Sequence, residues 1–544
     1  MTVGSFDRDE ALARLGAEAF DVLVVGGGVT GAGVALDAAA RGLRTAIVER
    51  DDWASGTSSK SSKLVHGGLR YLQQKEYRLV YENLAERQRL LVNAPHLVEE
   101  LPFLIPLFGR DGVVNPVVAK GYSWVLWLYD LTGGLRIGHR HRRITRSDAL
   151  RHLPTLRPDR IGAAFLYYDA RTDDARLTLA IVRTAALDHG VVAVNHLAVT
   201  ALTKDATGRV TGATVAGGTE IRATVVVNAA GVWADDVRAL DEASHPDSIR
   251  PAKGIHVTVP ADRLPCDIAA VIPVAKDRRS IFVVPWGEHT YIGTTDTDYT
   301  GSLADPECTP EDVDYLLEAV NMATTSALTV ADVTGTWAGL RPLVKHASTA
   351  RTADLSRRHR VDVAPSGLVT VTGGKLTTYR KMAADTVDTA VGAIGRGRRR
   401  SPTATLAIRG AVGLDYLRRP DAAARLGVTA AVLDHLAGRY GAETPRVIAS
   451  ARAEPALLDP LVPGLPYIRA EAVWAVRHEM ALTLLDVLAR RTRALLRDRA
   501  ATVAAAPDVA ALLAPLLGWD SAETARQVAT VTDLAAHERA AVER

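Results

Sequence analysis

The sequence predicts an α/β fold for roughly the first 395 residues and a separate all-α domain for the remainder. In the first part, apolar strand-like runs alternate with helical patterns, whereas beyond residue 404 the chain is rich in Ala, Leu and Arg and has few strand signals. The run GRGRRRSPTA (395–404) combines charge, Gly and Pro, which is typical of a domain boundary. A chain of 544 residues is also too long for a single core.

The composition is that of an ordinary globular protein, with 47% hydrophobic and 23% charged residues. A net charge of +3 gives no support for a nucleic-acid binder. Cys266 and Cys308 are not spaced as metal ligands or as a redox pair, so we predict no metal and expect a reducing cytoplasm. The N-terminus lacks a signal-peptide core, and the apolar window 113–134 is broken by a proline and two charges, which argues against a spanning helix.

The first chemical motif lies in FDVLVVGGGVTGAGVALDAAARGLRTAIVER (20–50), which runs from a strand through a glycine turn into a helix and a second strand. Gly26, Gly28 and Gly31 form GxGxxG, where missing side chains allow a tight turn and let a pyrophosphate approach the helix N-terminus. Glu49 ends the second strand and is suited to accept hydrogen bonds from an adenosine ribose. The segment therefore predicts a Rossmann-like dinucleotide site.

FAD and NAD both fit this motif, and later segments help to choose between them. TVVVNAAGVWADD (224–236) looks like a strand that ends at a cofactor-facing turn, and GLVTVTGGKLTTYRKMAADTVDTAV (367–391) like a strand, a Gly-Gly turn and a helix. Three separated segments that converge on one ligand indicate a large, elongated cofactor. The run GTSSKSSKLVHGGLRY (56–71) would by composition alone be a solvated linker.

Further elements have clear signatures. Residues 76–94 predict an amphipathic helix, and DDARLTLAIVRTAALDHG (173–190) predicts a helix capped by an acidic start and a terminal glycine. RRSIFVVPWGEHTYIGTTD (278–296) predicts a hairpin that turns at Gly287 and Glu288.

The C-terminal part contains a stretch with continuous helical periodicity, residues 467–500, for which we expect one or two long helices of a small bundle. We expect Arg490, Arg491 and Arg493 to lie on a solvated helix face, with an acidic partner as the alternative.

Together these motifs resemble the FAD-dependent glycerol-3-phosphate dehydrogenases of the respiratory, NAD-independent kind. The resemblance rests on GGGVTGAG, GTSSKSSKLVHGGLRYL, APHLVEELPFLIPL, DDARLTLA, IFVVPW with IGTTDTDY, GLRPL and GGKLTTYRK, which occur in that order within residues 20–395. It implies oxidation of sn-glycerol 3-phosphate to dihydroxyacetone phosphate by hydride transfer to FAD, with the electrons passed to a membrane quinone. An oxidase that uses dioxygen and a non-catalytic flavin-containing binding or regulatory protein are the alternatives.

The resemblance also implies the domain boundaries. An FAD-binding oxidoreductase domain spans 1–395, with nucleotide-binding segments at about 18–75, 160–240 and 350–395. An antiparallel-sheet substrate cap takes up about 76–159 and 241–349, and the helical C-terminal domain spans 404–544.

The cofactor contacts follow from chemistry and resemblance together. Hydroxyls and backbone amides of Thr57–Lys63 suit a diphosphate, because small side chains let the backbone come close. The resemblance places this loop under FAD and brings His66–Tyr71 past the isoalloxazine ring. The implied contacts are Gly26, Gly28, Gly31, Glu49, Thr57, Ser58, Ser59, Ser61, Ser62, Lys63, His66, Gly67, Gly231, Trp233, Gly374, Leu376 and Thr377.

The substrate carries a phosphate and therefore needs cations. By resemblance Arg341, Arg351 and Lys375 contact a phosphate or a carboxylate, with Arg70 and Tyr71 nearby. Arg341 and Lys375 are therefore also assigned to the catalytic set, together with two histidines.

Oxidation of an alcohol also needs a base, and histidine, with an ordinary pKa of about 6.5, is suited to that role. We favour His256 as the base and place His66 near the flavin.

One stretch suggests a membrane surface. Residues 122–129 hold four aromatic side chains, and arginines follow at 136, 140, 142, 143 and 146. Such residues favour an anionic lipid–water boundary, with packing between domains as the alternative. The resemblance thus implies a cytoplasmic protein, or one bound peripherally to the cytoplasmic face of the inner (cell) membrane, and it leaves a homodimer open.

Overall fold

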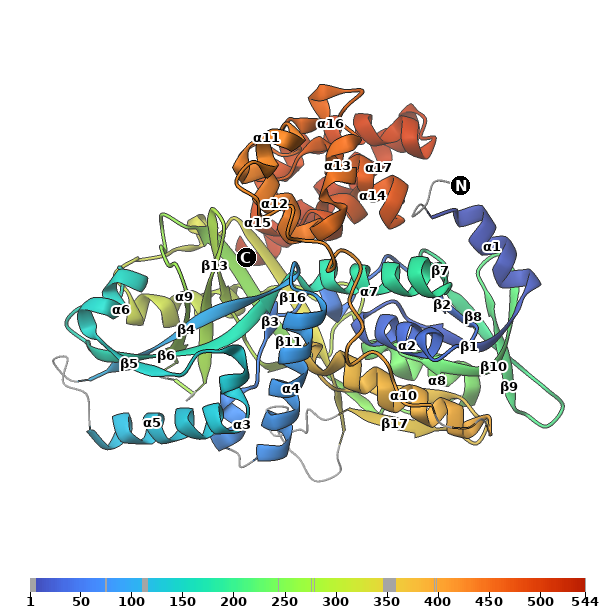
Figure 1. Cartoon of the computed structure of the whole chain (residues 1–544), viewed down its shortest axis with the longest axis horizontal. Coiled ribbons are helices and arrows are strands. Elements are labelled where there is room, and N and C mark those ends of the chain that lie inside the picture. The colour runs from blue at the N-terminus through green and yellow to red at the C-terminus, as the bar shows by residue number, and fades with distance from the viewer. Residues whose placement is uncertain are drawn as a thin grey trace.

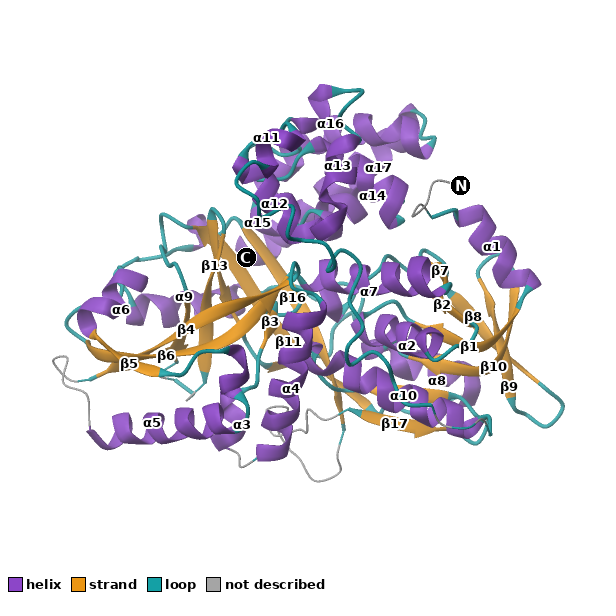
Figure 2. Ribbon diagram, viewed as in Figure 1, coloured by secondary structure: helices purple, strands orange, loops and turns teal. Residues whose placement is uncertain are grey.

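The computed structural model describes residues 6–73, 76–109, 116–242, 244–274, 276–277, 279–345, 359–395, 397 and 399–543. Two β-sheets with their helices lie side by side, and a helical domain formed by the C-terminal part of the chain lies across both of them (Figure 1). Figure 2 shows the same division by secondary structure, with the strands confined to the two lower bodies. The predicted fold class, a mixed α/β region followed by an all-helical domain, is confirmed.

The first sheet is the predicted Rossmann-like element. In spatial order its strands are β17 (Arg360–Val363), β18 (Val369–Thr372), β10 (Glu220–Asn228), β1 (Ala19–Val25), β2 (Thr45–Val48) and β7 (Val192–Val194). The pairs from β18 to β7 are parallel, and β8 (Val199–Lys204) with β9 (Val210–Val215) forms an antiparallel extension on β10. The helices packed on this sheet are α1 (Arg8–Ala17), α2 (Val29–Ala40), α7 (Asp174–His189), α8 (Ala234–Glu242) and α10 (Tyr379–Ala393).

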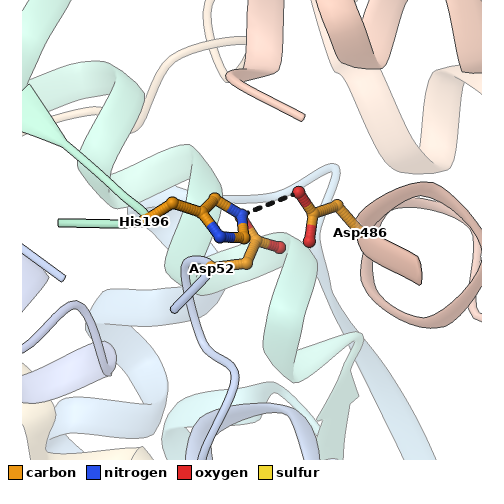
Figure 3. Close-up of side chains that lie close together, drawn as sticks. All are labelled: Asp52, His196 and Asp486. Carbon is orange, nitrogen blue, oxygen red and sulfur yellow. Dashed lines mark hydrogen bonds and ion pairs between the residues drawn. The ribbon is translucent and has the colours of Figure 1, made fainter. Parts of the chain in front are cut away.

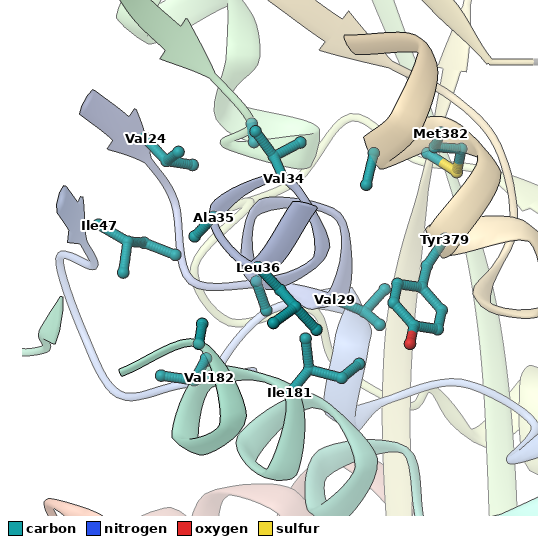
Figure 4. Close-up of a cluster of buried hydrophobic side chains, with 14 of the residues drawn as sticks. Val24, Val29, Val34, Ala35, Leu36, Ile47, Ile181, Val182, Tyr379 and Met382 are labelled. Carbon is teal, nitrogen blue, oxygen red and sulfur yellow. The ribbon is translucent and has the colours of Figure 1, made fainter. Parts of the chain in front are cut away.

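Strand β1 supplies a core to both faces of this sheet because successive side chains point to opposite sides. Val22 and Val24 pack with α2, α7 and α10, whereas Leu23 and Val25 pack with α1 and α8. Figure 4 shows α2 surrounded by side chains from β1, β2, α7 and α10. Burial on both faces requires the continuous apolar run of β1. The packing of Val22 and Val24 also holds α2 in place, and the N-terminus of α2 belongs to the site described below.

The second sheet is larger and mostly antiparallel. Its order is β15 (Thr297–Asp298), β11 (Ile249–Pro260), β14 (His289–Gly293), β13 (Ser280–Trp286), β12 (Ala269–Pro273), β4 (Val98–Phe108), β6 (Ile161–Thr172) and β3 (Leu64–Val65), with β16 (Gly335–Val344) on β11 and β5 (Arg142–Thr145) on β6. Among the described strand pairs of this sheet, β4–β12 alone is parallel. One face packs against α6 (Arg146–His152) and α9 (Pro310–Ala323), and the other against α3 (Leu69–Gln73), α4 (Tyr77–Asn93) and α5 (Pro116–Leu131).

Three local predictions are confirmed in these two bodies: the amphipathic helix as α4, the capped helix as α7, and the hairpin as β13–β14. Helix α7 begins after the side-chain cap of Asp173 and ends at Gly190, which has a φ of 74°. Two boundaries differ. The predicted segment 18–75 includes β3, which pairs with β6 at the edge of the second sheet. The predicted segment 160–240 includes β6, which pairs along its length with β4 and therefore belongs to the second sheet.

The helical domain contains α11 (Ala422–Leu426), α12 (Ala430–Tyr440), α13 (Thr444–Ala449), α14 (Arg469–Glu479), α15 (Ala494–Arg497), α16 (Arg499–Leu517) and α17 (Ser521–Glu543). The expectation of one or two long helices over 467–500 is wrong. Met480 and Arg493 adopt left-handed backbone conformations, with φ of 57° and 66°, and a π-helical turn covers Asp486–Arg491. Because of these breaks, Arg490, Arg491 and Arg493 point toward the N-terminal region. A straight helix would direct them elsewhere.

The expected solvated face of Arg490, Arg491 and Arg493 is also wrong. Arg491 and Arg493 are each 1% exposed, and all three guanidinium groups pair with carboxylates of the N-terminal region. A buried guanidinium loses hydration, so it requires such partners.

Helix α16 is long and apolar enough, by length and composition, to cross a membrane, with a mean hydropathy of 1.7. It packs instead in the helical domain, where Val509, Ala510 and Leu513 are buried beside α14 and α17. One face of α16 thus contributes to the core of the bundle, with 33% of the apolar window buried.

The last helix, α17, carries a carboxyl group with an unusual proton affinity. Glu538 lies 3.5 Å from the Arg499 guanidinium, and burial raises its pKa to about 7. The folded protein therefore binds a proton at Glu538 more tightly than the unfolded chain between pH about 4.5 and 7.

We expect Glu538 to make wild type lose stability, relative to Glu538→Gln, as the pH rises from about 5 to about 7.5. The measurement is the urea midpoint of both proteins across that range. Glu543→Gln, an exposed carboxyl on the same helix, is the control and should follow wild type. Parallel pH profiles for wild type and Glu538→Gln would contradict the shifted pKa.

Candidate active site

The glycine turn after β1 brings backbone close to backbone. Gly26 has a φ of 111°, which L side chains rarely adopt, and a Cβ on Gly31 would lie 1.9 Å from the Gly26 carbonyl oxygen. These two glycines are therefore required for the turn itself. Gly28 differs, because a Cβ there would meet only the Ser58 hydroxyl, at 3.2 Å, on the side of an open cavity.

That cavity extends from the N-terminus of α2 along the ends of β1, β2, β10 and β18. The predicted cofactor residues Gly26, Gly28, Glu49, Thr57, Ser58, Gly231, Trp233, Gly374 and Leu376 line it, together with Lys375. Residues from the three separated sequence segments thus meet at one place. Among the described residues, the lining does not include the other predicted contacts, which are Gly31, Ser59, Ser61, Ser62, Lys63, His66, Gly67 and Thr377.

One end of the cavity is apolar, formed by Leu197, Val199, Val237 and Leu240. Sequence reasoning missed these residues, because isolated apolar positions carry no motif and only the fold brings them together. Glu49 lies nearby and accepts hydrogen bonds from the amides of Gly27 (2.6 Å) and Asp51 (2.8 Å). Burial raises its pKa, and the two amide donors oppose that shift.

The run 56–71 connects the two sheets. Its first turn, Thr57–Ser59, lies against the cavity: the Ser58 hydroxyl accepts the Val29 amide at 2.9 Å, and Thr57 donates to the Leu340 carbonyl at 2.6 Å. Its next residues form β3 at the edge of the second sheet. Both ends of the run are thus fixed, which agrees with the expected loop beside the cofactor cavity and not with a solvated linker.

The middle of this loop points away from the cavity, toward a buried carboxylate. Ser61 donates to Asp174 through its amide (3.0 Å) and hydroxyl (2.7 Å), and the Lys63 ammonium donates to it at 2.9 Å. Burial, reinforced by the charge of Arg493, lowers the pKa of Lys63 to about 8, although Asp174 opposes the shift. Ser61 and Lys63 thus hold the loop rather than line the site.

His256 lies beneath the loop in an aromatic environment. Its Nε2 is 2.8 Å from the Ser62 hydroxyl, and its ring stacks on Trp337 at 4.7 Å between centroids. Burial, followed by the charges of Lys63 and Arg341, lowers its pKa well below the ordinary value. His256 is therefore a neutral imidazole at neutral pH.

His66 follows β3 and is partly exposed. Its amide donates to the Thr377 hydroxyl at 3.2 Å, which joins the loop to the Gly-Gly turn of the third segment. The amide of the next residue, Gly67, donates to the Tyr129 hydroxyl of α5 (3.0 Å) and to the Asp169 carboxylate of β6 (3.2 Å). Tyr129, which the sequence analysis grouped with the membrane-facing aromatics, is in fact 1% exposed.

The predicted substrate cations have different environments. Arg341 projects from β16 of the second sheet, and its Nη1 lies 3.0 Å from Oδ1 of Asp296. Its side chain is 27% exposed. The Lys375 ammonium lies 3.7 Å from the centre of the Tyr71 ring. Arg351 and the side chain of Arg70 lie outside the described residues.

A second group of titratable residues lies beside the site, where the helical domain meets the first sheet. Asp52, His196 and Asp486 lie close together, with one carboxylate oxygen or ring nitrogen of each within 4.8 Å of the others (Figure 3). Arg490 contacts both carboxylates, and Arg491 pairs with Asp52, so the group is a buried ion-pair cluster rather than a set of open metal ligands.

The geometry fits FAD. A cavity that begins at a helix N-terminus, passes the Glu49 carboxylate and ends among apolar side chains suits a dinucleotide with a flat ring.

Comparison with known proteins agrees. A family model described as FAD dependent oxidoreductase matches residues 21–380, and one described as the C-terminal domain of alpha-glycerophosphate oxidase matches residues 401–524.

Relatives extend the match over nearly the whole chain. Glycerol-3-phosphate dehydrogenase of Mycobacterium leprae is 44% identical over 97% of this chain and 90% of its own length. Its mitochondrial counterpart in Mus musculus is 39% identical over 94% of this chain and 72% of its length. The crystal structure of glycerol-3-phosphate dehydrogenase from Bacillus halodurans complexed with FAD has a TM-score of 0.79, with 32% identity and 97% coverage of both chains.

We expect Gly28→Val to yield folded but colourless protein, because the added side chain occupies the space beside Ser58 that a pyrophosphate needs. Flavin absorbance per mole of protein and the circular dichroism spectrum measure the two properties. Gly392→Val, at an exposed helix position with open space around it, is the matched control and should retain its flavin. Full flavin content in folded Gly28→Val would refute this assignment.

Proposed function

Because this chain belongs to the family of FAD-dependent glycerol-3-phosphate dehydrogenases, we propose that it oxidises sn-glycerol 3-phosphate to dihydroxyacetone phosphate and passes the electrons to a membrane quinone. The observation that carries the proposal is that the predicted substrate cations, Arg341 and Lys375, lie at or beside the cofactor cavity. Strand β16, which holds Arg341, runs beside the Thr57 turn, and Pro342 lines the cavity together with Lys375.

Bound FAD supplies the hydride acceptor, and the side chains of this chain bind the substrate and move the proton. The sequence analysis favoured His256 as the base, but its strongly lowered pKa makes it a weak one. We therefore assign the proton-accepting role to His66, which is partly exposed and lies on the loop between the cavity and the second sheet. His256 instead supports Ser62 from below.

Arg341 and Lys375 bind the phosphate in this proposal. Arg341 is prepositioned by Asp296, and its planar guanidinium suits bidentate binding of phosphate oxygens, whereas Lys375 adds a point charge above Tyr71. A phosphate that approaches this pair adds negative charge beside Asp296, so the two cations must outweigh that repulsion.

Anaerobic mixing with sn-glycerol 3-phosphate tests the half-reaction and excludes the non-catalytic alternative if the flavin absorbance bleaches. Reoxidation of the bleached protein by a quinone or by dioxygen then separates dehydrogenase from oxidase. We expect the quinone to be the faster acceptor. Faster reoxidation by dioxygen would favour the oxidase.

Arg341→Ala should lower kcat/KM for glycerol 3-phosphate by roughly 30- to several-thousand-fold, since loss of one partner of a shielded charge pair costs about 2–5 kcal/mol. The fall in kcat/KM is compared with that for glycerol, which has no phosphate for Arg341 to bind and should therefore be affected much less. Arg263→Ala, which removes an exposed arginine paired with Asp332, is the control. Equal losses on both substrates would show that Arg341 acts on the fold or the flavin.

We further propose peripheral attachment to the cytoplasmic face of the inner membrane through α5 and the segment after it. Trp124 is 75% exposed and Leu131 70% exposed on α5. Beside them Lys120, Arg140 and Arg143 line a surface hollow, and Arg140 stacks on Trp127 at 5.3 Å. Exposed aromatic side chains next to cations suit the interface of an anionic bilayer.

The purified protein should float with anionic vesicles at low salt and dissociate at high salt. Replacement of Arg140, Arg142 and Arg143 by Gln should reduce flotation strongly, because each cation contributes about 1 kcal/mol near the surface. The same replacement at Arg418, Arg419 and Arg452, exposed on the helical domain, is the charge-matched control. Unchanged flotation of the first variant would rule out this surface as the anchor.

A further inference from the structure

The helical domain inserts one arginine into the back of the cofactor loop. Arg493 sits at a break between a π-helical turn and α15, with a left-handed φ of 66°, and its side chain is 1% exposed. Its Nη2 donates to the Ser59 carbonyl and, at 3.1 Å, to an Asp174 carboxylate oxygen. Arg493 thus reaches the loop from a position 434 residues later in the chain.

Asp174 joins Arg493 to two further residues of the loop. One of its oxygens accepts both donors of Ser61, and the other accepts Lys63 and Arg493. Lys63 also donates to the Ser59 carbonyl at 3.2 Å, so this carbonyl receives two cations. The residues that line the cavity, Thr57 and Ser58, directly precede this network.

The other end of the loop segment is held in the same way. Arg490 and Arg491 bind Asp52 with nitrogen–oxygen distances of 2.6–2.9 Å. Trp53, the next residue, packs so closely on Gly27 that a Cβ there would lie 2.5 Å from its ring. The segment 52–63 is therefore clamped at both ends by arginines of the helical domain.

We propose that Arg493 is a positioning residue for FAD, and that the helical domain determines through it how tightly the chain holds its cofactor. All described residues that line the cavity precede residue 383, so the helical domain acts without touching the cofactor. Without Arg493 the Ser59 carbonyl and Asp174 lose a charged donor in a site that excludes water. The loop then loses the position that presents Thr57 and Ser58 to the cavity.

Another ion pair of the same interface provides a matched control. Glu443 binds Arg183 on the same helix, α7, and both side chains are buried. The described contacts of this pair do not include residues 52–63. Glu443→Gln therefore weakens the interface between the domains without changing the loop.

The test is the release of FAD from holoenzyme on dilution, followed by flavin fluorescence, for wild type, Arg493→Met and Glu443→Gln. Thermal unfolding with and without excess FAD is measured alongside. We expect Arg493→Met to bind FAD about tenfold or more weakly, as the loss of a charged hydrogen bond implies. Glu443→Gln should lower the unfolding temperature but leave the FAD dissociation constant within about twofold of wild type.

An unchanged dissociation constant in Arg493→Met, or an equal weakening in Glu443→Gln, would overturn the proposal, since the arginine would then be only an interface anchor. If Arg493→Met yields no soluble protein, Arg493→Lys decides the question, because lysine keeps the charge but lacks a guanidinium group that donates from Nη2 to Ser59 and Asp174 while Nη1 donates to the Ala489 carbonyl. The readout is cofactor affinity, so it stands independently of the proposed substrate and electron acceptor.

Discussion

The buried carboxylate of Asp174 organises the centre of this protein. It receives Ser61 and Lys63 from the loop that borders the cofactor cavity and Arg493 from the helical domain, and Asp174, Lys63 and Arg493 are all buried away from water. A buried charge of this kind is costly unless every partner is present. The arrangement therefore ties the first sheet, the loop and the helical domain into one unit around the site.

The same charges shape the chemistry next to them. Burial, reinforced by Arg493, lowers the pKa of Lys63, and burial, followed by the charges of Lys63 and Arg341, lowers the pKa of His256. Burial and the neighbouring cations together thus make His256 a poor base. His66, a second histidine on the same loop, is partly exposed and is not buried in this way.

Much of the fold follows from local sequence. The glycine turn, the capped helix α7, the hairpin β13–β14 and the carboxylate of Glu49 all have signatures within a few residues, and the structure has each of them. The path of 467–500 could not be predicted, because periodicity does not reveal a break at Arg493 that tertiary ion pairs stabilise. The inward turn of Ser61 and Lys63 likewise depends on Asp174, more than 100 residues away.

The central claim is that protein contacts, not the cofactor, hold the loop 57–63 in its position. Hydrogen exchange of peptides that cover this loop, measured on the full chain with FAD and after removal of FAD, tests it most directly. The account predicts slow exchange in both states, because the Ser61 amide and the Ser59 carbonyl are bound by Asp174 and Arg493. Rapid exchange of the loop once FAD is removed would contradict it.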